Sequence, residues 1–132
     1  MPEALDVLRD LHTLGIGIAL DDFGTGCTRL DQIRDLPIDT VKIDASFVSR
    51  MVDTDVDRET VEMIVALAQR RHLMVVAEGV ETVEQVEALG RLGCSQAQGF
   101  LFGRPVDVDE LRYLLREWHV VPAIATAFIR PR

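Results

Sequence analysis

Short apolar runs alternate along the chain with longer segments in which apolar residues recur every three or four positions. The runs lie at 16–20, 40–43 and 73–77, and a weaker one lies at 94–100. Runs of this length, rich in Val and Ile and bounded by loops, are typical of strands in a parallel sheet. Their alternation with helical segments predicts βαβ units in an α/β fold.

The longer segments predict helices with recognisable ends. They cover residues 2–14, 29–36, 45–51, 58–71, 83–92 and 107–118. Gly15 is a typical stop after the first helix, and Thr82 with Gln85 forms a capping-box pattern before the fifth. Asp107 and Glu110 suit the start of the last helix. The sequence therefore predicts an initial helix followed by about four strand–helix units.

Apolar spacing also predicts which faces of these helices are buried. The residues expected to pack inward are Val61, Ile64, Val65 and Ala68 in the fourth helix, Val83, Val86 and Leu89 in the fifth, and Leu111, Leu114, Leu115 and Trp118 in the last. Each set recurs at intervals of three or four residues, which places its members on one side of a helix. We expect these faces to cover the sheet.

Composition and charge narrow the class of protein. The chain has 132 residues, 48% of them apolar, and this is enough for one domain with a core. A formal net charge of −8 argues against a nucleic-acid surface. Cys27 and Cys94 show no paired spacing, so we expect a cytoplasmic protein. No apolar run approaches the roughly 20 residues of a membrane-spanning helix.

Charged residues stand where the predicted strands end. They are Asp21 and Asp22 after the first strand, Lys42 and Asp44 at the second, and Glu78 and Glu81 after the third. The carboxyl ends of parallel strands meet at one edge of a sheet, so these residues would share one site. Carboxylate oxygens are ligands that Mg²⁺ and Mn²⁺ prefer. The pattern therefore favours a metal-assisted active site.

The first of these positions also has a simpler interpretation. Successive strand residues point to opposite faces, so Asp21 and Asp22 share a site only where the strand has ended. Asp22 could instead order the turn at 23–26 through its side chain. Lys42 could stabilise a phosphate, or it could form a structural ion pair with Asp44 or Asp22.

The remaining polar residues are equally open to two interpretations. Asp44 could cap the helix at 45–51 in addition to any metal role. Glu78 could ligate a metal or act as a general base, whereas Glu81 could simply favour the start of the following helix. Gln98 could donate to a ligand or satisfy a loop carbonyl. We assign no role to the three histidines.

Four motifs occur in a fixed order: DDFGTG at 21–26, VKID at 41–44, AEGVET at 77–82 and QGFLFGRP at 98–105. They resemble the second half of the bacterial EAL domain, the cyclic di-GMP phosphodiesterase family named for a Glu-Ala-Leu motif. The resemblance implies the C-terminal portion of a TIM-like (β/α)8 barrel. It also implies two Mg²⁺ or Mn²⁺ ions that support opening of cyclic di-GMP to linear pGpG.

The resemblance assigns roles to individual residues. It implies metal binding for Asp21, Asp22 and Asp44, catalytic roles for Lys42 and Glu78, and substrate-binding or supporting roles for Glu81, Gln98, Gly24 and Gly26. The two glycines belong to a loop that the family links to dimerisation and activity. Cys27, Thr28 and Arg29 replace the family's usual Tyr-Ser-Ser run.

Part of the family pattern is missing from these 132 residues. The Glu-Ala-Leu motif and the family's asparagine and glutamate ligands would precede residue 1, so we expect residues 1–118 to be a partial EAL domain. Residues 119–132 match nothing in the pattern. We expect the metal site to be incomplete and the chain to be inactive alone, paired with a second copy or with a complementary N-terminal half.

Two other functions fit some of these features. A non-catalytic remnant would bind cyclic di-GMP weakly or bind a protein partner. An enolase-like barrel, with Mg²⁺ and a lysine base, fits the residue types but not the four motifs.

Overall fold

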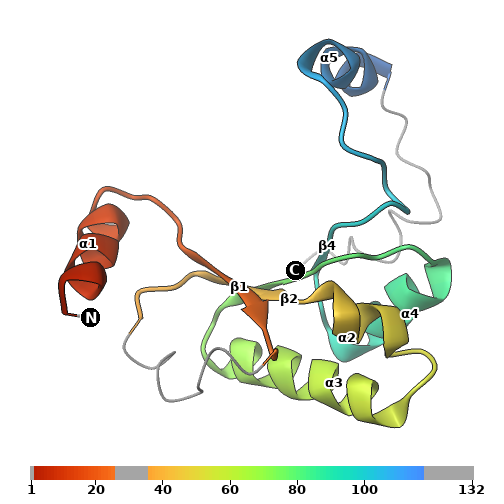
Figure 1. The fold of residues 1–132 in the computed structure, drawn as a ribbon, viewed down its shortest axis with the longest axis horizontal. Helices are drawn as coiled ribbons and strands as arrows, with labels where there is room; N and C mark the ends of the chain where they lie inside the picture. The colour runs from red at the N-terminus through yellow and green to blue at the C-terminus, as the bar shows by residue number, and fades with distance from the viewer. Residues whose placement is uncertain (1, 26–35, 118–132) are drawn as a thin grey trace.

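The structure, a computed structural model, describes residues 2–25 and 36–117 (Figure 1). Its elements are α1 (Pro2–Thr13), β1 (Ala19–Phe23), β2 (Thr40–Ile43), α2 (Ala45–Arg50), α3 (Asp55–Arg70), β3 (Met74–Ala77), α4 (Val83–Leu92), β4 (Gln96–Ala97) and α5 (Val108–Glu117). The helix predicted at 29–36 lies outside the described residues except for its last position, and so do Trp118 and the tail.

The four strands form one parallel sheet in the order β1-β2-β3-β4. Neighbours in the sheet are therefore also neighbours in the sequence, as in consecutive strands of a TIM-like barrel. Thr40 lies opposite Met74 and Ile43 lies opposite Ala77, so β2 and β3 end together. The predicted fold class, part of a (β/α)8 barrel, is confirmed.

The described helices next to the sheet bury one of its faces. In Figure 1, α2, α3 and α4 lie on the same side of the strands. Val41 and Ile43 of β2 are buried there, as is Ala77 of β3. Lys42 and Val76, which alternate with them, are half-exposed on the opposite face. Because side chains alternate along a strand, the Lys42 face of the sheet points away from α2, α3 and α4.

The first predicted strand differs from the observed one. The segment 16–20 was expected to be buried, but β1 begins at Ala19 and continues to Phe23, and Ile16 is 48% exposed. Phe23 is the buried residue of this strand. Among the described strands, β1 pairs with β2 alone. The apolar residues of this segment therefore predicted more burial than the structure shows.

The core follows the predicted helix faces with one exception. Val61, Ile64, Val65 and Ala68 of α3 are buried, and so are Val86 and Leu89 of α4. Val83 is 51% exposed, so that prediction was wrong. Gln85 is buried in its place, because both halves of the predicted capping box with Thr82 are formed. At about 100° per residue, Val83 lies about 160° around the helix from Gln85, at the margin of the buried face.

Two boundaries also differ from the sequence predictions. The helix expected from residue 58 begins at Asp55, which places Asp55 and Asp57 in its first turn, where the helix dipole favours negative charge. The strand expected at 94–100 is limited to Gln96–Ala97. Beyond it, the chain turns at Gly99, where a side chain would overlap the Val80 backbone.

The first and last helices stand away from the sheet (Figure 1). α1 is followed by Gly15, whose φ of +81° fits the predicted helix stop. The last helix begins as predicted, because Oδ1 of Asp107 accepts hydrogen bonds from the N–H groups of Asp109 and Glu110. Its apolar residues Leu111 and Leu115 are exposed, so they do not cover the described sheet as we expected.

Candidate metal and catalytic site

An irregularity in β1 places its two aspartates at one site. Between Leu20 and Phe23 this strand advances three residues, while the paired positions in β2, Val41 and Ile43, are two residues apart. One extra residue in a strand is a β-bulge, which redirects side chains. Asp22 accordingly has a positive φ of 51°. The strand therefore need not end before its aspartates can share a site.

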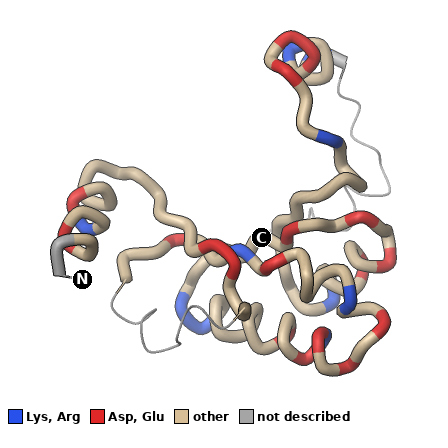
Figure 2. The backbone as a smooth tube through the Cα atoms, viewed as in Figure 1, with Lys and Arg blue, Asp and Glu red and all other residues tan. Residues whose placement is uncertain are grey.

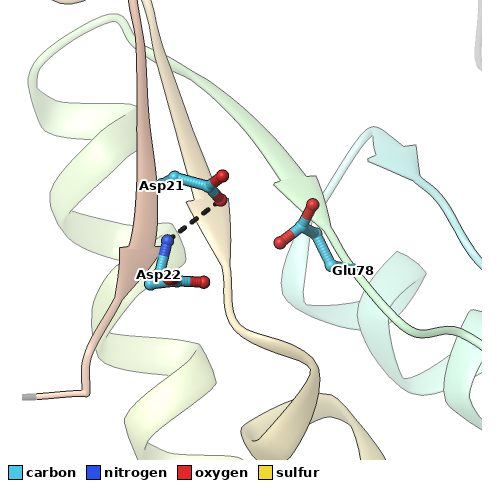
Figure 3. A group of neighbouring side chains, drawn as sticks. All are labelled: Asp21, Asp22 and Glu78. Carbon is cyan, nitrogen blue, oxygen red and sulfur yellow. Dashed lines mark hydrogen bonds between the residues drawn. The ribbon is translucent and has the colours of Figure 1, made fainter.

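Three carboxylates lie together at the ends of β1 and β3. Ligand oxygens of Asp21, Asp22 and Glu78 all fall within 4.8 Å of one another. Figure 3 shows the three side chains directed toward a common space between the strands. The two aspartates are exposed and Glu78 is half-buried. This group, called here the carboxylate triad, joins residues 57 positions apart in the sequence (78 − 21).

Lys42 on β2 lies between the two strands that carry the triad. Its Nζ atom is 3.2 Å from Oδ1 of Asp21 and also contacts Oε1 of Glu78. The sequence suggested Asp44 or Asp22 as an ion-pair partner, and the structure shows Asp21 and Glu78 instead. The Lys42 side chain is 25% exposed. Its charge is therefore balanced by the two carboxylates and partly solvated by water.

These contacts shift the acidity of both sides of the ion pair. The Glu78 carboxylate raises the pKa of Lys42 above its ordinary 10.5, and Asp21 adds to this effect against the opposing effect of burial. Lys42, followed by the N–H of Asp22, lowers the pKa of Asp21 below its ordinary 3.8. Lys42 therefore remains a cation and Asp21 an anion across the physiological pH range.

Asp44 follows β2 directly and lies outside the carboxylate triad. Its Oδ1 accepts the N–H of Ser46 at 2.9 Å, which makes it the predicted cap of α2. Hydrogen bonds from Ser46 lower the pKa of Asp44, and Asp22 is among the neighbours with the same effect. Asp44 therefore combines a structural role with a place beside the triad.

Glu81 and Gln98 lie farther along the same edge of the sheet. Glu81 is exposed, and its N–H donates to Oε1 of Gln85 at 2.8 Å. The backbone of Gln98 joins the segment after β4 to the segment at the end of β3. Its N–H donates to the carbonyl oxygen of Ala77, and its carbonyl oxygen accepts from the N–H of Val80. The structure therefore shows a loop role for the Gln98 backbone and leaves its exposed side chain available for a ligand.

Asp22 orders the turn after β1 through its backbone. Its carbonyl oxygen accepts from the N–H of Thr25 at 3.4 Å and from Oγ1 of Thr25 at 3.0 Å. The suggested role of the Asp22 side chain in this turn is thus taken by its carbonyl. Gly24 lies inside the turn with a φ of +104°. Gly26 lies outside the described residues.

The residues present fit a divalent cation. Oxygens around Mg²⁺ lie about 2.1 Å from the ion, so ligands on opposite sides are about 4 Å apart. The triad, with all its ligand atoms within 4.8 Å, needs only a small contraction to reach that size. Acidic residues are spread over α1, the strand ends, α3 and α4 (Figure 2). Among the described residues, the carboxylate triad is the group whose ligand atoms lie close enough together to hold a metal ion.

Comparison with known proteins places the chain in a family. The model of the EAL domain matches residues 1–105. The chain is 44% identical over 108 residues to the bifunctional diguanylate cyclase/cyclic di-GMP phosphodiesterase MucR of Pseudomonas aeruginosa. That match covers 82% of this chain and 16% of MucR. The chain thus spans about a sixth of this curated relative.

Solved structures give the same result. The MucR phosphodiesterase in complex with c-di-GMP superposes with a TM-score of 0.78 over 83% of this chain and 44% of that one. For the EAL domain of Mycobacterium smegmatis DcpA the identity is 42% and the TM-score 0.82, with 89% of this chain and 52% of that one covered.

A third structure is the manganese and cy-diGMP complex of Klebsiella pneumoniae BlrP1, with a TM-score of 0.71 and 36% identity over 76% of this chain and 26% of that one. Among the described residues, no helix has the length and apolar character needed to cross a membrane. The resemblance of the four motifs is confirmed over residues 1–105, and the chain belongs to the EAL domain family.

Proposed function

We propose that these residues supply the C-terminal part of a cyclic di-GMP phosphodiesterase site, which opens one phosphodiester of cyclic di-GMP to give linear pGpG. The observation that carries the proposal is the carboxylate triad with Lys42 between its members. Its place at the carboxyl ends of parallel strands is where barrel enzymes carry their active sites. The named activity of MucR and the ligands in the MucR and BlrP1 structures support the choice of substrate.

Asp21, Asp22 and Glu78 would hold one Mg²⁺ or Mn²⁺ ion, and Asp44 beside them would contribute to a second. Divalent ions at such a site lower the pKa of bound water and neutralise phosphate charge. The negative charge of the triad alone would repel a phosphodiester. Cations are therefore needed before an anionic substrate can approach this edge of the sheet.

Lys42 would stabilise charge on the phosphate. Its ammonium carries three N–H donors, and two of its contacts are with Asp21 and Glu78. A phosphate oxygen could accept the third, so the lysine would position the substrate against the metal-binding residues. Glu78 would serve as a metal ligand or, alternatively, accept a proton from the attacking water. Glu81 and Gln98 would provide supporting polar contacts.

The 132 residues hold only part of the proposed site. A closed barrel needs roughly twice as many strands as the four seen here. We therefore propose that residues 1–118 work together with a complementary set of strand–helix units, which either a longer chain or another molecule would provide. We expect no turnover by the 132 residues alone. A buried free thiol at Cys94 suits a reducing compartment, so we place the activity in the cytoplasm.

Binding of Mn²⁺ to the 132-residue chain tests the metal assignment. We expect Glu78→Gln to weaken binding by more than about tenfold, because loss of a ligand should cost at least as much as loss of an outer contact. Glu84→Gln is a matched control, since Glu84 is exposed on α4 and lies outside the triad. Equal affinities of wild type and Glu78→Gln would refute the assignment.

A further inference from the structure

Helix α2 touches both loops that carry the carboxylate triad. Gly24 comes two residues after Asp22, and Gly79 comes directly after Glu78. Both glycines have positive φ angles, +104° and +68°. Conformations of this kind are unfavourable for residues with a side chain. Each loop therefore turns sharply just after it has placed a carboxylate.

Neither glycine has room for a side chain, and residues of α2 occupy the space in both cases. A Cβ atom at Gly24 would lie 2.8 Å from Cε2 and 3.3 Å from Cζ of Phe47, and 3.2 Å from Cδ1 of Ile64 in α3. A Cβ atom at Gly79 would lie 2.5 Å from Cβ of Ala45. The ring of Phe47 and the methyl group of Ala45 thus pack directly against the backbones of the two loops.

The helix that makes these contacts is itself firmly held. Val48 and Met51, on its buried side, are both 0% exposed. Its last residue, Arg50, donates from Nε and Nη2 to the two carboxylate oxygens of Asp57, each at 3.0 Å. Its first turn is capped by Asp44. Because α2 is anchored at both ends and along one face, it can fix the position of whatever packs on it.

We propose that Phe47 and Ala45 are positioning residues, which set the separation of the Asp22 and Glu78 carboxylates and thereby the affinity of the triad for a divalent ion. The inference rests on the proposed metal site. Phe47 fixes the turn after β1, and Ala45 fixes the turn after β3. A shift of either backbone moves a carboxylate by a similar distance, because each glycine is only one or two positions along the chain from its carboxylate residue.

Mn²⁺ titration of the full 132-residue chain, followed by the electron paramagnetic resonance signal of free Mn²⁺, tests this inference. Phe47→Ala removes the ring beside Gly24, and we expect it to weaken Mn²⁺ binding by about tenfold. Phe47→Leu retains most of the packing volume, so it should recover most of the affinity. Leu89→Ala on α4 is the control: it destabilises the core but leaves α2 and its contacts with the two glycines unchanged, so Mn²⁺ affinity should remain that of wild type.

The opposite end of the helix gives an independent test. Ala45→Val enlarges the side chain facing Gly79 and should also weaken Mn²⁺ binding. Ser49→Val introduces the same side chain at an exposed position of α2 and should leave it unchanged. If Phe47→Ala does not fold, as judged by circular dichroism, the Ala45→Val result decides.

The outcomes separate the two proposals. If wild type binds Mn²⁺ and the folded Phe47→Ala and Ala45→Val variants bind it equally well, the positioning role is overturned while the metal site stands. A loss of affinity in Leu89→Ala equal to that in Phe47→Ala would also overturn it, because stability alone would then explain the effect. If wild type itself does not bind Mn²⁺, the proposal that the triad holds an ion in the 132-residue chain fails, and the positioning role fails with it.

Discussion

Lys42 on β2 reaches the neighbouring strand, where its Nζ atom lies 3.2 Å from Oδ1 of Asp21. The same ammonium contacts Glu78, so one cation already neutralises part of the triad. A divalent ion bound there would have to share these carboxylates with a positive charge.

This relationship predicts opposite effects of one substitution on metal binding and on turnover. Lys42→Met should tighten Mn²⁺ binding by roughly twofold to fivefold, as expected when partly exposed charge contacts are lost. In an EAL domain with a complete barrel, the same substitution should reduce cyclic di-GMP hydrolysis, because the phosphate loses a positive contact. Titration and product analysis on the same variant measure the two effects. Weaker Mn²⁺ binding by Lys42→Met would show that the lysine does not compete with the ion.

Gly79→Ala should destabilise the protein more than a glycine substitution in open space. A φ of +68° costs an alanine about 1 kcal/mol, and the clash with Ala45 adds about 1–3 kcal/mol of overpacking. Gly15→Ala is the matched control, because Gly15 also has a positive φ but no atom of the described residues lies within 4 Å of the place that a Cβ atom would take. Chemical denaturation should give the larger loss for Gly79→Ala, and equal losses would contradict the contact with α2.

The Arg50–Asp57 ion pair predicts a pH-dependent contribution to stability. Arg50, followed by Thr54, lowers the pKa of Asp57 below its ordinary 3.8. A carboxyl group whose pKa is lowered by folding stabilises the protein above its unfolded pKa, and this stabilisation is lost as the pH falls through the lowered value. The difference in unfolding free energy between wild type and Asp57→Asn should therefore be constant at neutral pH and shrink below pH 3.8. A difference that grows on acidification would contradict the ion pair.

The edge strands of the described sheet predict association. β1 and β4 each pair with one described strand, and unpaired strand edges favour contact with another chain. Leu111 and Leu115 on α5 are also exposed. Sedimentation velocity of the 132-residue chain should show species larger than a monomer, which shift toward monomer at lower concentration. A single monomeric species at all concentrations would contradict this expectation.

Local signals in the sequence predicted much of the fold. The capping box of Thr82 and Gln85 depends only on residues three positions apart, and it is formed. The buried face of α3 likewise follows from the spacing of Val61, Ile64 and Val65. The exposure of Val83 could not be predicted in this way, because it depends on how the buried Gln85 orients the whole helix.

The sequence indicated which residues could form the candidate site, but it did not indicate how they are arranged. Strand ends indicated Asp21, Asp22 and Glu78, yet the bulge that brings the two aspartates together arises from pairing with β2. The sequence suggested Asp44 or Asp22 as the ion-pair partner of Lys42, whereas its partners are Asp21 and Glu78. Strand pairing decides which carboxylates face the lysine, and residue spacing does not give that pairing. The sequence analysis gave no role to Phe47. Gly24, two positions after Asp22, was the one feature that pointed to a close neighbour at this turn.

Hydrolysis of cyclic di-GMP by a chimeric EAL domain tests the central claim most directly. In this chimera, residues 1–105 of the chain replace the matching segment of the MucR phosphodiesterase domain. We predict that the folded chimera forms pGpG in the presence of Mn²⁺ and that Asp21→Ala abolishes this activity. An Asp21→Ala chimera as active as its parent would contradict the proposed metal site.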